Sequence, residues 1–469
     1  MKFKKSLFFI LYLYPMNIHF IAIGGAVMHN LAIALHKKGY RVTGSDDEIF
    51  EPSRSRLSAY SLLPEKPGWF PERINKNLDA VILGMHAFPD NPELLRAQET
   101  GVRIYSFPEY LYEQSKDKIR VVIGGSHGKT TITSMVMHVM NHYDQHFDYM
   151  VGSQIEGFET MVRISEDAEV MILEGDEYLS SPVDPRPKFL LYKPHIALLT
   201  GIAWDHMNVF PTFENYLEQF RKFIDVIEPA GKLYYFQGDS HLPGIVKSAP
   251  SSVEIVHYDT HPYEVMDGIY QLLTGSGKVG VPVLGRHNMQ NIRGAMLVCR
   301  DLGISDAQFY KAIRSFKGAA RRQQLLAGND SVKIYLDFAH APSKVKATAE
   351  AFREAYPGKR LIACLELHTF SSLNEAFLPH YAGSLRDADT AMVYFNPEVV
   401  RHKKLPELSK EQVKAEFGSG NVMVYDDAKL LVQDLMQMDF TGSIVLFMTS
   451  GNFSGLDLRS AAEKIVKGE

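Results

Sequence analysis

The chain has 469 residues, of which 45% are hydrophobic and 22% are charged, as in an ordinary water-soluble globular protein of roughly two to four domains. Its formal net charge of −5 excludes the strongly basic composition of a nucleic-acid-binding protein. The two cysteines, Cys299 and Cys364, exclude a disulfide scaffold and favour a reducing, cytoplasmic compartment.

The first fifteen residues resemble the start of a secretory signal, because lysines at positions 2, 4 and 5 precede the apolar run Leu7–Tyr14. The run is short and no small-residue cleavage site follows it. Met16 leads directly into a strand pattern, so we expect Met16 to be the true start and residues 1–15 to be a mis-assigned extension. No apolar run approaches the roughly 18 residues of a membrane span, so we expect no stable membrane insertion.

Residues 16–117 form the first predicted domain. A strand at Ile18–Ile23, a glycine turn at Gly24 and Gly25 and a helix over Met28–Lys38 precede a second strand at Tyr40–Thr43. That strand ends in Gly44, Ser45 and Asp46, and a third strand follows at Ala80–Leu83. An acidic residue about 20 positions after a glycine turn predicts a ribose contact in a Rossmann-like domain. The turn departs from GxGxxG, so a purely structural turn is the alternative.

The second predicted domain, residues 118–318, follows a polar linker at Glu113–Lys118 and carries the most informative segment of the chain. The apolar strand Ile119–Ile123 runs into Gly124-Gly125-Ser126-His127-Gly128-Lys129-Thr130-Thr131 and then into a helix pattern. A glycine loop points backbone N–H groups at phosphate oxygens, the helix N-terminus and the lysine add positive charge, and the threonine hydroxyl can bind Mg²⁺. This order of strand, glycine loop, lysine, threonine and helix predicts a P-loop ATPase-type domain, although the loop is one residue shorter than the usual motif.

Two clusters of polar residues follow strands of this domain. Glu174-Gly175-Asp176-Glu177 comes after the strand Val170–Leu173, and Asp205-His206 comes after the strand Ile196–Thr200. Ligands of open α/β sheets bind at the carboxyl ends of the strands, so these side chains are candidate Mg²⁺ ligands. A solvated acidic loop and a structural histidine are the alternatives.

The third predicted domain, residues 319–469, has strands at Val332–Leu336, Arg360–Leu365, Ala391–Tyr394 and Ser443–Met448, with helical stretches between them. Strands that alternate with helices predict parallel sheets throughout the chain. The fold class predicted from the sequence is therefore α/β in three blocks, of which the first is Rossmann-like.

Six motifs, taken in order, resemble those of the Mur ligase family, the ATP-dependent amide ligases that build the peptide stem of bacterial peptidoglycan. They are the glycine loop, Glu174–Glu177, Asp205-His206, Gly285–Asn291, Arg321-Arg322 and Asp337–Pro342. The resemblance covers residues 16–469. It implies three domains: an N-terminal Rossmann-like domain for the UDP-sugar, a central P-loop ATP-binding domain and a C-terminal Rossmann-like domain for the incoming amino acid or peptide.

The family resemblance also implies roles for individual residues. Lys129, Glu174 and His206 are the candidate catalytic residues, and Thr130, Glu174 and His206 are the candidate Mg²⁺ ligands. The UDP-sugar would contact Gly24, Gly25, Ser45 and Asp46. The candidates for ATP binding are Gly125, His127, Gly128, Lys129, Thr130, Thr131, His287, Asn288, Asn291, Arg322, Asp337 and His340.

The reaction that the resemblance implies begins with phosphorylation of a carboxylate by ATP. Mg²⁺ and Lys129 would neutralise the repulsion between the carboxylate and ATP, and a free amine would then attack the acyl phosphate. Water must be excluded from this intermediate, so we expect the third domain to close over the site. The implied partners are UDP-N-acetylmuramate and an amino-acid or tripeptide acceptor. We expect a monomer or weak dimer and no nucleic-acid partner.

Two branches of the family use UDP-N-acetylmuramate, and they differ in the acceptor. Glu174–Tyr178 and the pattern Lys188-Phe189, Tyr192 and Pro194 are similar to the branch that attaches L-alanyl-γ-D-glutamyl-meso-diaminopimelate in cell-wall recycling, which is our main prediction. The branch that attaches L-alanine is the alternative enzyme, and a catalytically weak nucleotide-binding regulator is the alternative class.

Several residues depart from the family pattern. His368 stands in a segment where an arginine is expected, which affects the predicted acceptor site, and Ala341 replaces a common second histidine. Gln323 stands where glutamate is common. Phe220 occupies the position at which several members carry a carbamoylated lysine, so we predict no such modification.

Overall fold

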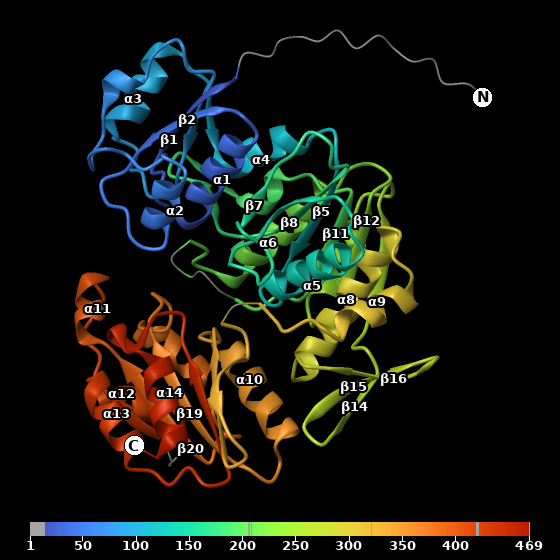
Figure 1. Ribbon diagram of the computed structural model, residues 1–469, viewed down its shortest axis with the longest axis vertical. Helices are drawn as coiled ribbons and strands as arrows, with labels where there is room; N and C mark the ends of the chain where they lie inside the picture. The colour runs from blue at the N-terminus through green and yellow to red at the C-terminus, as the bar shows by residue number, and fades with distance from the viewer. Residues whose placement is uncertain (1–14, 205–206, 208, 320, 419–421, 469) are drawn as a thin grey trace.

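The computed structural model describes residues 15–204, 207, 209–319, 321–418 and 422–468, and these residues form three successive α/β units (Figure 1). This arrangement confirms the predicted fold class. In the described part of the chain, no helix is long and apolar enough to cross a lipid bilayer.

The first unit is a parallel sheet with the strand order β2-β1-β3-β4. Strand β1 ends at Ile21, two residues earlier than predicted, because Ala22 adopts a φ of 65°. The N–H groups of Ala22 and Ile23 both donate to the carbonyl oxygen of Ser45, which fixes the glycine turn beside the end of β2. The elements are β1 (Asn17–Ile21), α1 (Ala26–Lys37), β2 (Arg41–Ser45), α2 (Ser53–Ala59), η1 (Pro71–Arg73), β3 (Ala80–Leu83), α3 (Pro92–Thr100), β4 (Ile104–Ser106) and α4 (Phe107–Ser115).

The second unit is built on a sheet with the order β13-β12-β11-β5-β8-β6-β7. Strand β5 lies between β11 and β8, with Gly124 opposite Leu199 and Ile123 opposite Glu174, so the segments that follow all three strands meet at one edge. The strands of this sheet are β5 (Ile119–Gly124), β6 (Asp148–Met150), β7 (Val162–Arg163), β8 (Val170–Glu174), β11 (Ile196–Leu199), β12 (Lys232–Phe236) and β13 (Glu254–Tyr258). Its helices include α5 (Lys129–His142), α6 (Phe213–Asp225), α8 (Arg286–Asp301) and α9 (Asp306–Ile313).

The expectation of parallel sheets is wrong at several places in the second and third units. Strand β7 runs antiparallel to β6, and β9 (Leu179–Ser181) and β10 (Asp184–Pro187) form a hairpin that η2 (Lys188–Leu191) follows. A separate antiparallel sheet contains β14 (Tyr263–Met266), β15 (Ile269–Thr274) and β16 (Gly277–Val281). Asp267 and Gly268, both with positive φ, form the two-residue turn between β14 and β15. An Asp-Gly turn is a strong hairpin signal, which the expectation of helical connections overlooked.

The small sheet β14–β16 projects from the second unit beside α10 (Pro342–Ala355) of the third unit (Figure 1). The hydroxyl groups of Tyr263 and Tyr270 both donate to the carboxylate of Glu354 on α10. Tyr270 is fully buried, and the pKa of its hydroxyl is raised by that burial and by Glu354. This sheet therefore provides a polar contact between the second and third units.

The third unit is a sheet with the order β17-β18-β22-β19-β20-β21, in which only the pair β17 and β18 is antiparallel within the described residues. Its strands are β17 (Gln324–Gly328), β18 (Val332–Asp337), β19 (Arg360–Leu367), β20 (Thr390–Phe395), β21 (Val422–Tyr425) and β22 (Ser443–Met448). Its other helical elements are η4 (Glu375–Tyr381), α11 (Pro397–His402), α12 (Lys410–Phe417), α13 (Ala428–Met436), η5 (Phe453–Gly455) and α14 (Leu458–Lys467). The two helical turns α7 (Leu242–Ile245) and η3 (Val246–Ser248) complete the second unit.

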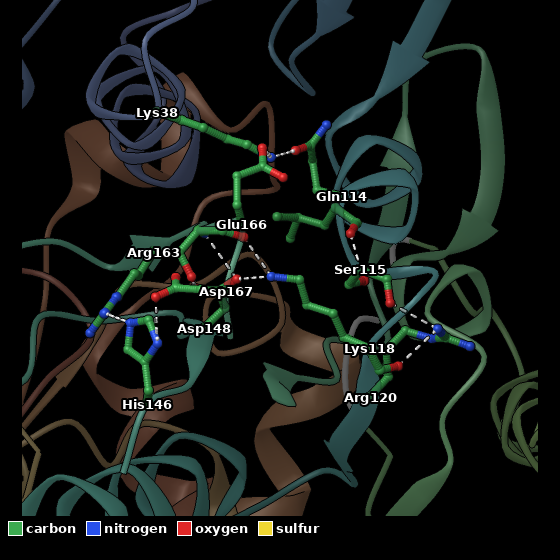
Figure 2. A network of polar contacts seen from close by, with 12 residues as sticks. Lys38, Gln114, Ser115, Lys118, Arg120, His146, Asp148, Arg163, Glu166 and Asp167 are labelled. Atoms are coloured by element: carbon green, nitrogen blue, oxygen red, sulfur yellow. Dashed lines mark hydrogen bonds and ion pairs between the residues drawn. The ribbon is translucent and has the colours of Figure 1, made fainter. Parts of the chain in front are cut away.

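The junction of the first and second units is a network of polar contacts (Figure 2). Lys38, just after α1, contacts Gln114 at 2.8 Å and Glu166 at 2.8 Å, and Lys118 contacts Asp148 and the carbonyl oxygen of Ser165. The predicted linker is partly helical, because α4 begins with a capping box at Ser106 and continues to Ser115.

Arg120 on β5 holds this junction together. Its guanidinium is 1% exposed and donates to the carbonyl oxygens of Tyr192, Lys193, Ser115 and Lys116 at 2.8–2.9 Å. The remaining nitrogen contacts Glu228 at 2.7 Å. Burial lowers the pKa of Arg120, and Glu228 opposes that effect. One side chain thus donates hydrogen bonds to carbonyl groups at the end of α4 and in the turn after η2.

We expect Arg120→Met to lower the free energy of unfolding by about 3 kcal/mol, because it leaves several buried carbonyl groups and one carboxylate without their donor. Chemical denaturation measures this change. Arg300→Met is the matched control, since Arg300 makes only a half-exposed pair with Asp306 and should change stability by less than about 1 kcal/mol. Equal effects of the two substitutions would contradict the role given to Arg120.

Candidate active site

The phosphate loop occupies the carboxyl end of β5, and its shape requires two of its glycines. Gly125 has a φ of 120°, and a Cβ there would lie 2.1 Å from Oγ1 of Thr200. Gly128 has a φ of 71°, and a Cβ there would lie 2.4 Å from Oδ1 of Asn291. Helix α5 begins directly after Gly128, so its first N–H groups face the loop, as phosphate binding requires.

Lys129, the first residue of α5, lies in the loop with its amine already paired. Nζ donates to the carbonyl oxygen of Gly125 at 2.7 Å and to Oε2 of Glu177 at 2.6 Å. Burial acts to lower the pKa of Lys129, but Glu177 and the other nearby carboxylates raise it overall, so the amine stays charged. Tyr216 in turn donates to Oε1 of Glu177 at 3.0 Å, and Ser126 lies 2.8 Å from the same tyrosine hydroxyl.

Thr130 and Glu174 form the described part of the predicted Mg²⁺ site. Oγ1 of Thr130 donates to Oε1 of Glu174 at 2.8 Å, and the N–H of Gly152 donates to Oε2 at 2.7 Å. Burial raises the pKa of Glu174, while Gly152, Lys129 and Thr130 lower it in part. These are hard oxygen donors of the kind that Mg²⁺ takes together with phosphate oxygens, so the pair fits the ion.

The third predicted ligand, His206, and its neighbour Asp205 lie outside the described residues. Among the residues that the structure does describe, no three His, Cys, Asp or Glu side chains gather as a metal site. Of the three predicted ligands, the described residues therefore supply the hydroxyl of Thr130 and the carboxylate of Glu174.

A cavity of about 650 Å³ opens in front of the loop, between the second and third units. All predicted ATP-binding residues except Gly125 line it, namely His127, Gly128, Lys129, Thr130, Thr131, His287, Asn288, Asn291, Arg322, Asp337 and His340. Asn291 donates to Oδ1 of Asn288 at 3.1 Å on α8, and burial lowers the pKa of His287. The structure thus brings the nucleotide candidates of two units to one cavity.

Two contacts join the third unit to the second at this cavity. Oγ of Ser343, at the start of α10, lies 2.9 Å from Nε2 of His127 in the phosphate loop. Gln323 accepts from the N–H of Leu284 at 2.8 Å and donates to the carbonyl oxygen of Leu284 at 3.0 Å. A glutamate at position 323 could not donate to that carbonyl oxygen, so the departure from the family pattern has a structural use here.

The predicted UDP-sugar residues lie in the first unit, away from the cavity. The N–H of Gly24 donates to Oδ2 of Asp46 at 2.7 Å, and Ser45 is buried at the end of β2. Burial raises the pKa of Asp46 to about 6. The carbonyl oxygen of Gly25 lies 2.9 Å from Nδ1 of His29 on α1. These residues form one turn at the carboxyl edge of the first sheet.

The pattern that favoured a tripeptide acceptor is accounted for by packing. Phe189 and Tyr192 are fully buried, and Phe189 stacks on Phe223 with ring centroids 4.6 Å apart. Lys188 pairs with Asp176 at 2.6 Å. Phe220, at the carbamoyl-lysine position of relatives, is fully buried in the same aromatic cluster.

Sequence reasoning missed several residues that the structure places at the site. Glu177 pairs with Lys129, and Gln154, Ser343, Lys344 and Arg321 line the cavity. Glu177 enters the sequence motifs only as part of the acidic segment Glu174–Glu177, and Arg321 only as part of the motif Arg321-Arg322. Gln154, Ser343 and Lys344 belong to no motif, and only the folded chain brings them to the cavity.

At the end of β19, Glu366 is 2% exposed and accepts hydrogen bonds from Thr449 and from the N–H of Phe453. Nδ1 of His368 lies 3.8 Å from Oε1 of the same carboxylate, and Arg321 donates to the carbonyl oxygen of Gly451 at 2.6 Å. The segment expected to carry the acceptor site therefore lies at the carboxyl edge of the third sheet, on the side of the cavity.

These features define a three-domain α/β protein whose phosphate loop faces a cavity between its second and third units. Family models match the chain as the "Mur ligase family, catalytic domain" at residues 17–118, the "Mur ligase middle domain" at 123–299 and the "Mur ligase, glutamate ligase domain" at 321–451. The chain belongs to the Mur ligase family, and it is an ATP-dependent ligase that forms amide bonds. The resemblance predicted from its motifs is confirmed.

Similar proteins cover nearly the whole chain. A UDP-N-acetylmuramate–L-alanine ligase of Carboxydothermus hydrogenoformans is 29% identical over 455 residues, which are 93% of this chain and 94% of that protein. One of Aquifex aeolicus is 26% identical over 93% of this chain and 95% of its own.

Solved structures show the same fold at lower identity. The murein peptide ligase of Psychrobacter arcticus has a TM-score of 0.65 at 20% identity, over 97% of this chain and 98% of its own. The UDP-N-acetylmuramate–alanine ligase of Thermotoga maritima has a TM-score of 0.68 at 19% identity, over 96% and 98%.

We expect Lys129→Ala to lower ligation by at least about 10³-fold, because the amine supplies positive charge to the transferred phosphoryl group. Rates of ADP release measure the loss, and the unfolding midpoint checks that the fold survives. Lys118→Ala is the control, since Lys118 lies at the other end of β5 and should leave the chemistry unchanged. Near-normal turnover of folded Lys129→Ala would refute the assignment.

Glu174→Gln should raise the Mg²⁺ concentration needed for half-maximal activity, because it removes one anionic oxygen while keeping the shape of the side chain. Titration of activity against Mg²⁺, after removal of metal by a chelator, measures the shift. The Michaelis constant for the sugar substrate should stay the same. An unchanged Mg²⁺ dependence in both Glu174→Gln and His206→Ala would exclude this metal site.

Proposed function

We propose that the enzyme joins the carboxylate of UDP-N-acetylmuramate to the amine of an acceptor that begins with L-alanine. The observation that carries the proposal is the meeting of Lys129, Thr130 and Glu174 in one cavity that the third unit covers through Ser343. The cavity suits ATP, and the glycine turn at Gly24 suits the uridine diphosphate. A cytoplasmic site of action is part of the proposal, since ATP is consumed and both cysteines are free and buried.

The first half of the reaction activates the carboxylate. The N–H groups at the start of α5 and the amine of Lys129 hold the phosphate chain of ATP, which requires that Lys129 turn from Glu177 toward the phosphate. Thr130 and Glu174 would hold Mg²⁺, which would supply further positive charge. The carboxylate oxygen of the sugar then attacks the γ-phosphorus, ADP leaves, and an acyl phosphate forms.

In the second half, the acceptor amine attacks the acyl carbon and phosphate leaves, so that one amide bond replaces one phosphoanhydride bond. The amine must lose a proton during attack, and the acyl phosphate must be kept from water. The contacts of Ser343 with His127 and of Gln323 with Leu284 hold the third unit over the cavity and provide that protection.

Free L-alanine is the first candidate acceptor. The relatives from Carboxydothermus hydrogenoformans and Aquifex aeolicus are named as UDP-N-acetylmuramate–L-alanine ligases, and they align along nearly all of this chain. This choice reverses the preference drawn from the sequence pattern around Lys188. That pattern is weak evidence for acceptor specificity, since the burial of Phe189 and Tyr192 explains why aromatic residues stand at these positions.

The tripeptide is the second candidate. Arg321, Arg322 and Lys344 line the third-unit side of the cavity, and a peptide with several carboxylates needs cationic groups of this kind. The same side chains could contact ATP, so they do not decide between the acceptors. Both acceptors present an L-alanyl amine to the same acyl phosphate.

A competition assay decides the acceptor. The enzyme is incubated with UDP-N-acetylmuramate, ATP, Mg²⁺ and equal concentrations of L-alanine and tripeptide, and the products are identified by mass spectrometry. We expect the L-alanine product to exceed the tripeptide product at least about tenfold, the discrimination that about 1.4 kcal/mol provides. Lys129→Ala protein is the blank. A dominant tripeptide product would restore the recycling reaction, and absence of ADP release with either acceptor would favour a nucleotide-binding regulator.

A further inference from the structure

A continuous chain of polar contacts links the predicted sugar-binding turn to helices α1 and α2. It begins at Gly25, whose carbonyl oxygen lies 2.9 Å from Nδ1 of His29. Nε2 of His29 lies 2.9 Å from Nδ2 of Asn30, and both side chains are buried. Burial lowers the pKa of His29, so the ring is neutral and can donate from Nδ1 while it accepts at Nε2.

The chain continues from the first unit into the second through Asn30 and Arg56. Oδ1 of Asn30 accepts from the N–H of Met161 at 2.9 Å and from Nη1 of Arg56 at 3.3 Å. Nη2 of Arg56 then donates to Oε1 of Gln154 at 2.7 Å. Arg56 is on α2, whereas Met161 and Gln154 lie in the loop between β6 and β7, so these contacts cross the boundary between the units.

The same loop reaches the ATP cavity. Gln154 and Gly152 both line the cavity, and the N–H of Gly152 donates to Oε2 of Glu174 at 2.7 Å. A Cβ at position 152 would lie 3.0 Å from Oε1 of Glu174, so the backbone passes directly against the carboxylate. One loop therefore contacts the helices of the first unit at one end and the candidate metal ligand at the other.

The reaction makes the relative placement of these units important. The sugar donor is anchored in the first unit, but its carboxylate must reach the phosphate of ATP in the second. Reacting atoms need to lie about 3–3.5 Å apart, and an error of about 1 Å can cost about 10²-fold in rate. A contact that fixes the first unit relative to the cavity would act on the chemical step.

We propose that Arg56 is a positioning residue for the sugar donor, which acts through Gln154 to place the carboxylate at the ATP cavity. The inference rests on the proposed donor and adds a residue outside the predicted motifs. The planar guanidinium suits this task, because it holds Asn30 and Gln154 at once and neither acceptor carries a charge that would draw it away.

Two other described contacts across the boundary, those of Lys37 and Lys38, do not have this geometry. Lys37 pairs with Glu159 at 2.6 Å, but the side chains are 41% and 66% exposed. Lys38 pairs with Glu166, whose side chain is 81% exposed (Figure 2). Exposed pairs of this kind contribute little, and neither pair contains a residue that lines the cavity. Substitution of these lysines therefore tests whether loss of any contact between the two units is enough to lower activity.

The test compares Arg56→Ala with Arg54→Ala, an exposed arginine on the same helix. For Arg56→Ala we expect kcat/KM for UDP-N-acetylmuramate to fall about 30-fold or more, as a misplaced donor predicts. The dissociation constant of a non-hydrolysable ATP analogue, measured by calorimetry without sugar, should stay within about twofold of wild type. Arg54→Ala and Lys37→Ala should match wild type in both measurements, and Arg56→Lys should recover only part of the loss.

Gln154→Ala and the double variant test whether Arg56 acts through Gln154. If it does, the double variant loses no more than the more impaired single variant. If the double variant instead loses activity by the product of the two single losses, the proposal is overturned. It is also overturned if Arg56→Ala weakens binding of the ATP analogue as much as it lowers kcat/KM. If wild type ligates but Arg56→Ala is unaffected, only this inference fails. If wild type does not use UDP-N-acetylmuramate at all, the proposed function itself fails.

Discussion

The site depends on how closely the phosphate loop approaches its neighbours. Gly125 passes against Thr200, and Gly128 passes against Asn291, so neither position has room for a side chain. This close approach places the start of α5 between the end of β11 and helix α8. The amine of Lys129, the hydroxyl of Thr130 and the amide of Asn291 then face one cavity, which a looser loop would not achieve.

Within that frame, the buried charged groups of the site have hydrogen-bond partners from the protein itself. Lys129 is satisfied by Glu177 and by the loop carbonyl of Gly125, and Glu174 is satisfied by Thr130 and Gly152. Buried charges require such partners, because an unpaired charge in the interior is costly. Under the proposed function, binding of ATP and Mg²⁺ would exchange one set of partners for another, and the difference in free energy between the two sets would determine the affinity.

Much of the fold and part of the candidate site could be predicted from the sequence, because their signals are local. The phosphate loop and Glu174 each lie at the end of one apolar strand, and the α/β pattern gave the fold class. Arg56, Gln154 and Ser343 could not be predicted, since their contacts join segments far apart in the chain. The segment from Lys188 to Tyr192 does not decide the acceptor, because a single sequence cannot separate packing from specificity. His206 lies outside the described residues, and its role stays a prediction.

The small sheet β14–β16 has a mechanical consequence. Its tyrosines hold Glu354 near the end of α10, while Gln323 holds the third unit at Leu284 near the cavity. Neither Glu354 nor the two tyrosines line the cavity. A substitution of Glu354 would therefore change how the third unit is held without altering any side chain that faces the site.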